Sequence, residues 1–321
     1  MQSRPTPEGT FEPTAKTPVG VILAAGTGAR LGNGCKPLAR VAGITLLERA
    51  IVTLREAGVA RIIVVVGHAG DQVERFVEER GLDVELVRND DFPRGNGSSA
   101  LVGGRAAGRR FLVTMADHVV EPGAVAKLLA SNARFAAAVD SDPRYCDVEE
   151  ATKVRLNGHS VIAIDRELEE FDGVDAGMFV CDADLLPVAE RALANGEGSW
   201  NAVRRRCLTE GLEIEAVDLG GAFWIDVDTP HEARRAERLL VAHAAGKSHD
   251  AAVAHLLNRR LSRPLSLLLV RVGLSPNAVT VATFLLALVA ATGLALGSLW
   301  TAALIAGGLL VQLASIVDGV D

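Results

Sequence analysis

Residues 19–38 read VGVILAAGTGARLGNGCKPL, a short apolar run that leads into a glycine-rich turn and then a lysine. The β-branched residues at its start predict a buried strand, and the small residues after it let backbone amides approach a ligand closely. Arg30 and Lys36 place positive charge beside the turn. The stretch therefore predicts a triphosphate-binding loop at the carboxyl end of a first strand.

Two other kinds of glycine-rich phosphate loop do not match this stretch. Leu31 stands where the dinucleotide-binding fingerprint has its third glycine, and no acidic residue ends the next apolar run, 61–66. Lys36 is followed by Pro37 rather than by the Ser or Thr of a P-loop. A different nucleotide-binding architecture is therefore indicated.

Short apolar runs alternate with amphipathic stretches through the first 140 residues. The predicted strands are 19–23, 61–66, 84–87, 111–115 and 135–139, and the predicted helices are 46–57, 72–79, 98–108 and 124–129. This rhythm is typical of an α/β fold with an open, mostly parallel, Rossmann-like sheet, in which ligands bind at the carboxyl ends of the strands.

A different rhythm follows Asp140. The predicted elements are strands 152–156, 161–164 and 174–180, helices 185–194 and 200–208, strands 212–217 and 223–225, and a last helix from Pro230. The turn at Asn157 and Gly158 joins the first two strands as a hairpin. We therefore expect a small antiparallel substrate lobe beside the main sheet.

Two aspartates follow predicted strands. Asp117 comes after 111–115 and Asp226 after 223–225, so both carboxylates are expected at the edge where ligands bind. Two oxygen donors suit Mg²⁺, which takes its remaining ligands from water and phosphate. A single aspartate after a strand is also a common helix cap.

Four further residues are candidates for ligand contacts. Gly97 and Ser98 begin a predicted helix, where they either read a base or phosphate or only cap the helix. Lys153 is a candidate for the acceptor phosphate or an exposed strand residue, and Asp175 binds substrate hydroxyls or only shapes a turn. Three histidines without partners at metal-ligand spacing are expected to be incidental: His68, His118 and His231.

The composition excludes several classes of protein. The net charge is −7, and no basic patch is interleaved with aromatic residues, which argues against nucleic acid as a partner. The four cysteines are far apart, so neither a zinc knuckle nor a disulfide framework is expected, and a reducing cytoplasm fits best. Residues 1–17 are polar and rich in Pro and Thr, and we expect a disordered leader there.

The carboxyl-terminal part has the composition of a membrane segment. Arginines punctuate an apolar pattern in 256–271, which predicts an amphipathic helix on a membrane surface. Two apolar stretches, 279–296 and 299–317, each approach the length of a membrane span. The arginines precede the first span, so the amino-terminal part is expected in the cytoplasm. The expected domains are 18–246, a linker with the amphipathic helix at 247–275, and two transmembrane helices within 276–321.

The glycine loop resembles a known signature. The run from Leu23 to Leu31, followed by Lys36-Pro37-Leu38, is similar to that of the sugar-phosphate nucleotidyltransferases, and the resemblance extends from Val19 to about Ala245. It implies that Arg30 and Lys36 contact phosphates and that Lys36 stabilises charge on the attacked α-phosphate. It also implies that the loop wraps the nucleotide through Leu23, Ala24, Ala25, Gly26 and Gly28.

The same resemblance implies a metal site. Residues 115–118 are similar to the family's first metal-binding aspartate segment, and residues 224–229 to its second. Asp117 would then contact both nucleotide and metal. Relatives often have Gly where Asp228 stands, so the choice between Asp226 and Asp228 stays open, with Asp226 favoured.

The tail resembles a second family. Residues 273–280 are similar to the entry of the first transmembrane helix in the CDP-alcohol phosphotransferases, and Asp318 and Asp321 have the spacing of that family's first two signature aspartates. The later aspartates do not follow in this sequence, so phosphotransferase activity is not expected from it. Together the two parts resemble the bifunctional inositol-1-phosphate cytidylyltransferase and di-myo-inositol-phosphate phosphate synthases. That resemblance implies CTP, inositol-1-phosphate and Mg²⁺ as ligands and a multi-pass place in the cell membrane.

Residue chemistry alone specifies neither the base nor the acceptor. A choline-phosphate cytidylyltransferase would favour an aromatic cage, yet aromatics make up 4% of the chain and Tyr145 is its one tyrosine. A sugar-1-phosphate enzyme using UTP or GTP is a further alternative. An inactive, membrane-anchored nucleotide-binding module is the alternative of another class, and intact Lys36, Asp117 and Asp226 weigh against it. The sequence leaves a homodimer open.

Overall fold

The computed structural model describes residues 18–28, 31, 34–246, 265, 268, 276–295 and 300–318. The chain divides into unit 1, which comprises Met1–Ala39 and Leu46–Asp228, and unit 2, which comprises Arg40–Thr45 and Thr229–Asp321. The expected leader 1–17 lies outside the described residues, as does the expected amphipathic helix 256–271 apart from two helical positions.

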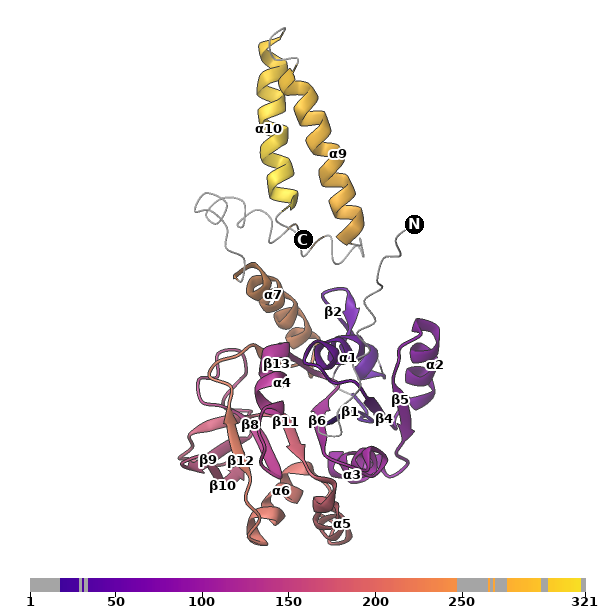
Figure 1. The fold of residues 1–321 in the computed structure, drawn as a ribbon, viewed down its shortest axis with the longest axis vertical. Helices are drawn as coiled ribbons and strands as arrows, with labels where there is room; N and C mark the ends of the chain where they lie inside the picture. The colour runs from indigo at the N-terminus through magenta and orange to yellow at the C-terminus, as the bar shows by residue number, and fades with distance from the viewer. Residues whose placement is uncertain are drawn as a thin grey trace, which may run out of the picture. The chain divides into compact units, whose positions relative to one another are not determined.

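Unit 1 is built on a nine-stranded sheet in the order β5-β4-β1-β6-β11-β8-β12-β10-β9 (Figure 1). The first four strands of this order run parallel, and β11 is antiparallel to both β6 and β8. The bounds are β1 (Val19–Ala24), β4 (Ile62–Val66), β5 (Glu85–Arg88), β6 (Phe111–Met115), β8 (Phe135–Asp140), β9 (Lys153–Asn157), β10 (Ser160–Asp165), β11 (Gly173–Cys181) and β12 (Glu215–Asp218).

Helices cover both faces of this sheet. Alternate residues of β1 point to opposite faces, so Val21 and Leu23 join one core cluster while Ile22 and Ala24 join the other. The first cluster includes residues of α3 (Asn96–Ala107), α5 (Leu186–Ala194) and α6 (Trp200–Thr209). The second includes residues of α1 (Leu46–Glu56), α2 (Gly70–Arg80) and α4 (Pro122–Leu129). Burial on both faces explains why the central strands are apolar without alternation.

The sequence predictions are confirmed for the order and type of these elements, with two corrections. The antiparallel strands do not form a separate lobe, because β9 pairs with β11 and β10 with β12, which extends the main sheet. The sequence also missed β7 (His118–Val120), which forms a two-stranded ribbon with the predicted strand β13 (Trp224–Asp226). In this ribbon Asp226 lies opposite His118, which brings the two predicted aspartate segments together.

Among its described residues, unit 2 contains a short hairpin and three helices with known bounds. The hairpin joins β2 (Arg40–Val41) to β3 (Ile44–Thr45), and the helices are α7 (Pro230–Gly246), α9 (Pro276–Ala295) and α10 (Thr301–Asp318). The start of α7 is stabilised by a capping box, in which the Thr229 amide donates to Glu232 and the Glu232 amide donates to the Thr229 hydroxyl.

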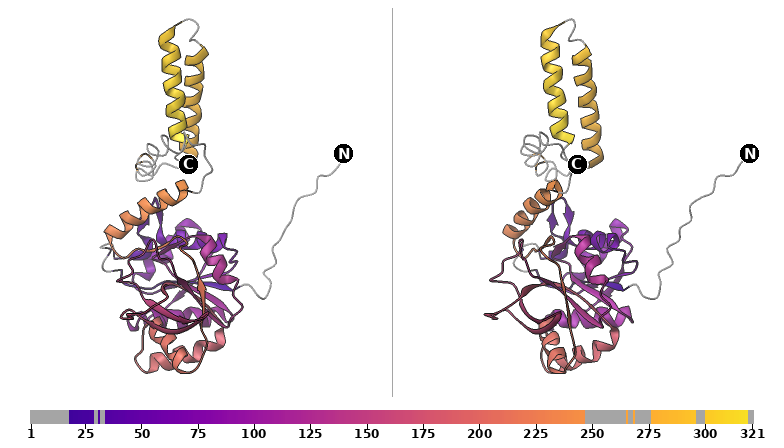
Figure 2. Two further views of the ribbon diagram at one scale, coloured as in Figure 1. Left: turned by 90° about the vertical axis from the view of Figure 1, so that its left-hand side faces the viewer. Right: turned by 60° about the vertical axis from the view of Figure 1, so that its left-hand side comes forward.

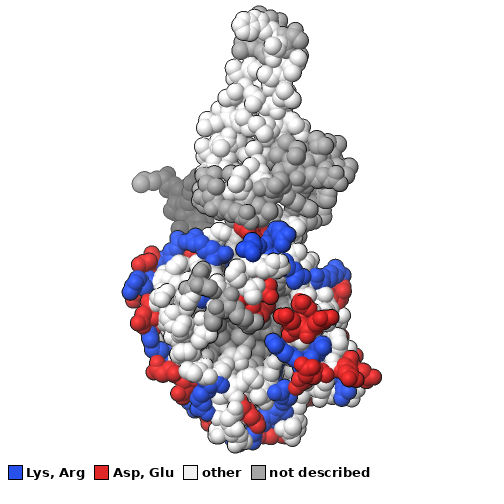
Figure 3. Space-filling model, turned by 180° about the vertical axis from the view of Figure 1, so that it is seen from behind, with Lys and Arg blue, Asp and Glu red and all other residues white. Residues whose placement is uncertain are grey.

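The helices α9 and α10 lie side by side (Figure 2). A Cβ on Gly307 of α10 would lie 2.7 Å from the backbone nitrogen of Leu294, so a glycine is needed for this close packing. The described surface of the pair carries no charged side chain (Figure 3). Within the described residues, Asn277–Ala295 is long and apolar enough to cross a membrane, whereas the apolar part of α10, Ile305–Ala314, is shorter.

A buried carboxylate fixes the loop that leads into β13. Asp140 is fully buried at the end of β8 and accepts hydrogen bonds from Trp224 Nε1 and from the Gly221 amide, both at 2.8 Å. Asp140→Ala leaves these buried donors without a partner, so we expect it to lower the free energy of unfolding by about 3 kcal/mol. For a domain of this size that is roughly 6 to 12 °C in the melting temperature.

Thermal denaturation of the full chain in detergent measures this loss. Asp142→Ala is the matched control, because the Asp142 side chain makes an exposed ion pair with Arg144 that is worth less than about 1 kcal/mol. Equal melting temperatures for the two variants would contradict the assignment of Asp140 as a structural anchor.

Candidate active site

A cavity of about 390 Å³ opens at the carboxyl ends of β1 and β6. Four of the predicted nucleotide-binding residues, Leu23, Ala24, Ala25 and Gly26, line one wall, and Asp117 lines another. The remaining lining residues come from the same loops and from the start of α3: Thr27, Lys36, Pro37, Phe92, Pro93, Gly95, Asn96, Ser99, Met115 and Ala116. The structure therefore places a hollow where the strand order predicted a ligand site.

Gly28 allows the loop to pass close to Lys36. Its φ is 56°, in the left-handed region, and a Cβ there would lie 2.4 Å from the Cβ of Lys36. Lys36 itself begins the short 3₁₀ helix η2 (Lys36–Leu38). Arg30, the second predicted phosphate-binding cation, lies outside the described residues.

Gly28→Ala is expected to lower kcat/KM by about tenfold to a hundredfold, because the new Cβ displaces Lys36 from its place beside the cavity. Gly158→Ala is the matched control, since Gly158 has a similar φ of +61° but no described atom within 4 Å of its Cβ position. Equal kinetic losses in the two variants would show that backbone strain, and not the contact with Lys36, limits activity.

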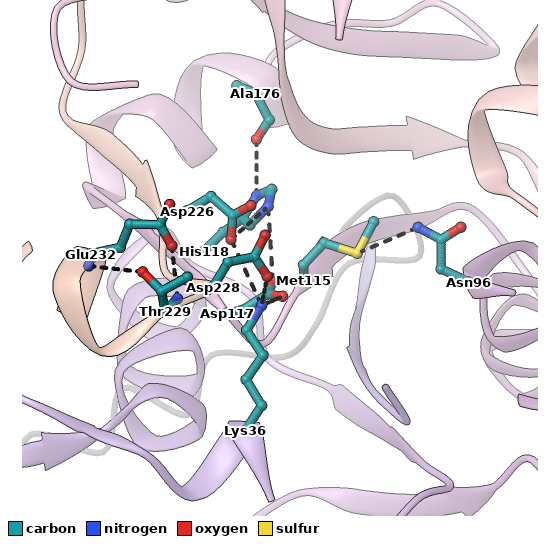
Figure 4. Close-up of polar contacts among 10 residues, drawn as sticks. All are labelled: Lys36, Asn96, Met115, Asp117, His118, Ala176, Asp226, Asp228, Thr229 and Glu232. Carbon is teal, nitrogen blue, oxygen red and sulfur yellow. Dashed lines mark hydrogen bonds and ion pairs between the residues drawn. The ribbon is translucent and has the colours of Figure 1, made fainter. Parts of the chain in front are cut away.

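Lys36 is buried and lies at the centre of a cluster of partly exposed acidic side chains (Figure 4). Its Nζ lies 2.5 Å from Asp117 Oδ2 and 4.0 Å from Asp226 Oδ1, and it donates a hydrogen bond to Asp228 Oδ1. Burial lowers the pKa of Lys36, but the neighbouring carboxylates together raise the pKa by more and hold it above its ordinary value. The ammonium is therefore charged and faces three acidic side chains.

The carboxylates of this cluster differ in their environments. Burial raises the pKa of Asp117, yet Lys36 and His118 hold the pKa of its carboxyl below the ordinary value. Burial raises the pKa of Asp226 to about 6, and the negative charge of Asp117 adds to that effect. Asp228 bonds to Lys36, whereas Asp226 lies at the longer distance from it. The sequence had left the roles of Asp226 and Asp228 open, and here only Asp226 groups with Asp117 and His118.

Asp117, His118 and Asp226 offer ligand atoms that all lie within 4.8 Å of one another. Oδ1 of Asp117 and Oδ1 of Asp226 are buried and have no hydrogen-bond partner among the described residues. Two buried carboxylate oxygens without a donor fit a cation between them. The donor set therefore fits a divalent ion such as Mg²⁺.

His118 is a residue that the sequence analysis had treated as incidental. Its Nδ1 lies 3.2 Å from the carbonyl oxygen of Ala176, so Nδ1 carries the proton and donates it. Nε2 then faces Oδ1 of Asp117 at 3.9 Å and Oδ1 of Asp226 at 3.8 Å. A carbonyl that orients an imidazole toward a cation is a common arrangement at metal sites. Only the pairing of β7 with β13 reveals this role.

At the start of α3, Gly97 and Ser98 lie outside the lining of the cavity, so their contact with a nucleotide stays a prediction. The Gly97 amide donates to the Gly198 carbonyl, and the Ser98 hydroxyl bonds to the carbonyls of Asp91 and Gly95, so neither residue offers these groups to the cavity. Their neighbours Asn96 and Ser99, which belong to the same predicted helix start, line the cavity instead. Asn96 and Ser99 are three positions apart, so they share one face of α3, and Gly97 and Ser98 lie on another. The sequence alone did not show which face of the helix turns toward the cavity.

The two predicted substrate-binding residues lie outside the lining of this cavity. Lys153 is on β9 with its Nζ 5.6 Å from the centre of the Phe171 ring. Both carboxylate oxygens of Asp175 accept hydrogen bonds from Arg204, at 3.0 and 2.5 Å. Asp175 is therefore already paired with Arg204, and its contact with substrate hydroxyls stays a prediction.

Comparison with known proteins agrees with this geometry. Residues 20–210 match the family model described as the MobA-like NTP transferase domain. The chain is 45% identical to the bifunctional IPC transferase and DIPP synthase of Rubrobacter xylanophilus, over 94% of this chain and 68% of that protein. It is 38% identical to the protein of the same name from Thermococcus kodakarensis, over 94% of this chain and 67% of that one.

Among solved structures, the inositol-1-phosphate CTP transferase from T. maritima superposes with a TM-score of 0.63 at 22% identity. The superposition covers 69% of this chain and 95% of that one. At this identity the likeness is one of fold, and it extends over nearly all of the other protein.

Proposed function

This chain belongs to the family of the bifunctional IPC transferases and DIPP synthases, and from that membership we propose that it transfers the cytidylyl group of CTP to inositol-1-phosphate. The products are CDP-inositol and pyrophosphate. The observation that carries the proposal is the placement of Lys36 between the acidic residues Asp117 and Asp228 at one end of a cavity lined by the glycine loop.

The reaction needs little covalent chemistry from the protein. An oxygen of the acceptor phosphate forms a bond to the α-phosphorus of CTP, and the bond from that phosphorus to the bridging oxygen breaks, with its electron pair leaving on pyrophosphate. A phosphate monoester is already anionic near neutral pH, so no side chain has to remove a proton. Catalysis then rests on positioning and on neutralising charge.

The residues of the cluster divide these tasks. The glycine loop from Leu23 to Gly28 holds the nucleotide, with Asn96 and Ser99 on the opposite wall. Lys36 neutralises the charge that develops on the α-phosphate, and Asp228 keeps its ammonium in place. Asp117 and Asp226 would hold the cation, and bound Mg²⁺ would supply positive charge that neutralises the phosphates.

Two further contacts are proposed, that of Arg30 from the resemblance to the nucleotidyltransferases and that of Lys153 from its place in the sequence. Arg30 follows the glycine loop and is proposed to contact the phosphates of CTP. Lys153 is proposed to reach the acceptor phosphate from β9, where its ammonium stacks on an exposed Phe171 that a ligand displaces at little cost.

The membrane part of the proposal concerns unit 2. We propose that α9 and α10 both span the bilayer and that the arginine-rich stretch before α9 keeps unit 1 in the cytoplasm. Asp318 ends α10, and Asp321 lies outside the described residues. Their spacing is that of the CDP-alcohol phosphotransferase signature. A phosphotransferase with this signature would use CDP-inositol on the side of the membrane where unit 1 makes it.

The test uses the full chain in detergent with Mg²⁺, each of the four nucleoside triphosphates and a panel of phosphate monoesters, with pyrophosphate as the readout. The panel contains inositol-1-phosphate, choline phosphate and glucose-1-phosphate. CTP with inositol-1-phosphate is expected to give the highest kcat/KM. Preference for another pair would replace the substrates, and nucleotide binding without pyrophosphate from any pair would support the inactive module instead.

A further inference from the structure

Arg204 on α6 is buried, yet it takes no part in the proposed chemistry. Its side chain is 0% exposed and that of Asp175 is 7% exposed. The guanidinium makes two hydrogen bonds to Asp175, a third to Asn201 Oδ1, and stacks 4.6 Å from the centre of the Phe179 ring. Burying such a pair is costly unless the geometry is well satisfied, so the pair calls for a role other than stability.

Asp175 lies at the start of an irregular stretch of β11. The pairing of β11 with β8 shifts register between Asp175 and Phe179, the two residues of β11 that the Arg204 side chain contacts. The Asp175 carboxylate also accepts from the Gly177 amide at 3.4 Å, and the Asp175 amide donates to the Thr152 carbonyl at 2.8 Å. Arg204 therefore holds both ends of this bulge.

The bulge faces the proposed cation site. Gly177 has a φ of +71°, and a Cβ on it would lie 2.0 Å from Cε1 of His118. The carbonyl of the preceding Ala176 accepts from Nδ1 of His118. The bulge thus supplies both the space and the acceptor that orient His118 toward the unpartnered oxygens of Asp117 and Asp226.

The start of α6, the helix that carries Arg204, is hydrogen-bonded to a residue of the nucleotide cavity. The Trp200 amide at the start of α6 donates to Oδ1 of Asn96, a cavity residue, at 2.8 Å. The Gly97 amide donates to the Gly198 carbonyl at 2.9 Å. Helix α6 therefore contacts the nucleotide cavity through Trp200 and the β11 bulge through Arg204.

We propose that Arg204 is a positioning residue for the cation site: by holding Asp175 and Phe179 it sets the β11 bulge that orients His118 toward Asp117 and Asp226. The inference rests on the cation site of the proposed function, but it adds a residue that contacts neither substrate nor cation. Loss of a residue that orients a metal ligand typically weakens metal binding by about 10- to 100-fold.

The test measures Mn²⁺ binding to the full chain in detergent by electron paramagnetic resonance, without substrates. The double variant Arg204→Met with Asp175→Asn removes the pair without leaving a buried charge, and the expected result is an approximately tenfold weaker Mn²⁺ affinity. Arg205→Met is the matched control on the same helix, because Arg205 makes an exposed ion pair with Asp165. Its Mn²⁺ affinity should equal that of the unmodified chain.

A cycle with His118→Ala separates positioning from general loosening of the fold. If Arg204 acts through His118, the double variant adds no further loss of Mn²⁺ affinity in the His118→Ala background. Unchanged Mn²⁺ affinity in the double variant, or losses that multiply in the combination, would overturn the proposal. If the double variant does not fold, Arg204→Lys, which keeps the charge without the two-bond fork, is judged by the same two criteria. Mn²⁺ binding that survives Asp117→Ala would instead count against the cation site itself.

Discussion

Asp117→Ala is expected to lower kcat/KM about a thousandfold, which corresponds to about 4 kcal/mol of transition-state stabilisation. The substitution removes one of the two unpartnered oxygens of the proposed cation site and one of the acceptors of Lys36. The cation is then held less tightly and the ammonium is less well placed. Steady-state kinetics over a range of Mg²⁺ concentrations measure both effects.

The control for Asp117 is Asp83→Ala. The Asp83 side chain is 99% exposed and pairs with Arg55 at the surface of the same unit, so its removal should leave kcat/KM unchanged. An Asp117→Ala variant with a normal melting temperature and near-normal turnover would be incompatible with the metal assignment.

Lys36→Met is expected to lower kcat by roughly a hundredfold to a thousandfold, because one preorganised charge facing the reacting phosphate is lost. The effect on Mn²⁺ binding should be opposite to that of Asp117→Ala. Removal of the ammonium leaves Asp117, Asp226 and Asp228 without a neutralising charge, so Mn²⁺ binding should stay as tight or become tighter.

The opposite effects of Asp117→Ala and Lys36→Met on Mn²⁺ affinity distinguish a residue that holds the cation from one that neutralises the phosphate. Lys127→Met on the exposed side of α4 is the control for loss of a lysine, and it should alter neither kcat nor Mn²⁺ affinity. A Lys36→Met variant that loses Mn²⁺ binding while keeping its kcat would show that the lysine organises the cation site and not the phosphate.

The sequence predicted the parts of the molecule that depend on local patterns. The strand before the glycine loop, the crossover helices and the positions of Asp117 and Asp226 at strand ends all follow from periodicity and residue type. Lys36 was identified from its place after the loop, and the structure brings it to both aspartates although 81 and 190 positions separate it from Asp117 and Asp226 in the chain. Each of these sequence patterns lies within a few residues of the strand, helix or loop that it predicts.

The features that were missed depend on pairing between distant segments. Strand β7 has three residues, too few for a periodic signal, yet its pairing with the predicted strand β13 brings His118 to Asp226. The insertion of β11 between β6 and β8, and its bulge at Asp175, depend on pairing between strands that are distant in the sequence. For the same reason Asp175 was interpreted from its own neighbours in sequence and not from Arg204, which lies 29 positions later.

The central claim is that Lys36, Asp117 and Asp226 assemble around the triphosphate of CTP and its cation. Diffraction at the manganese edge from crystals grown with Mn²⁺ and a non-hydrolysable CTP analogue tests it most directly. The account predicts an anomalous peak at coordination distance from both Asp117 and Asp226, with the α-phosphate of the analogue facing Lys36 in the cavity of the glycine loop. A manganese peak away from those two carboxylates, or an analogue bound outside that cavity, would contradict it.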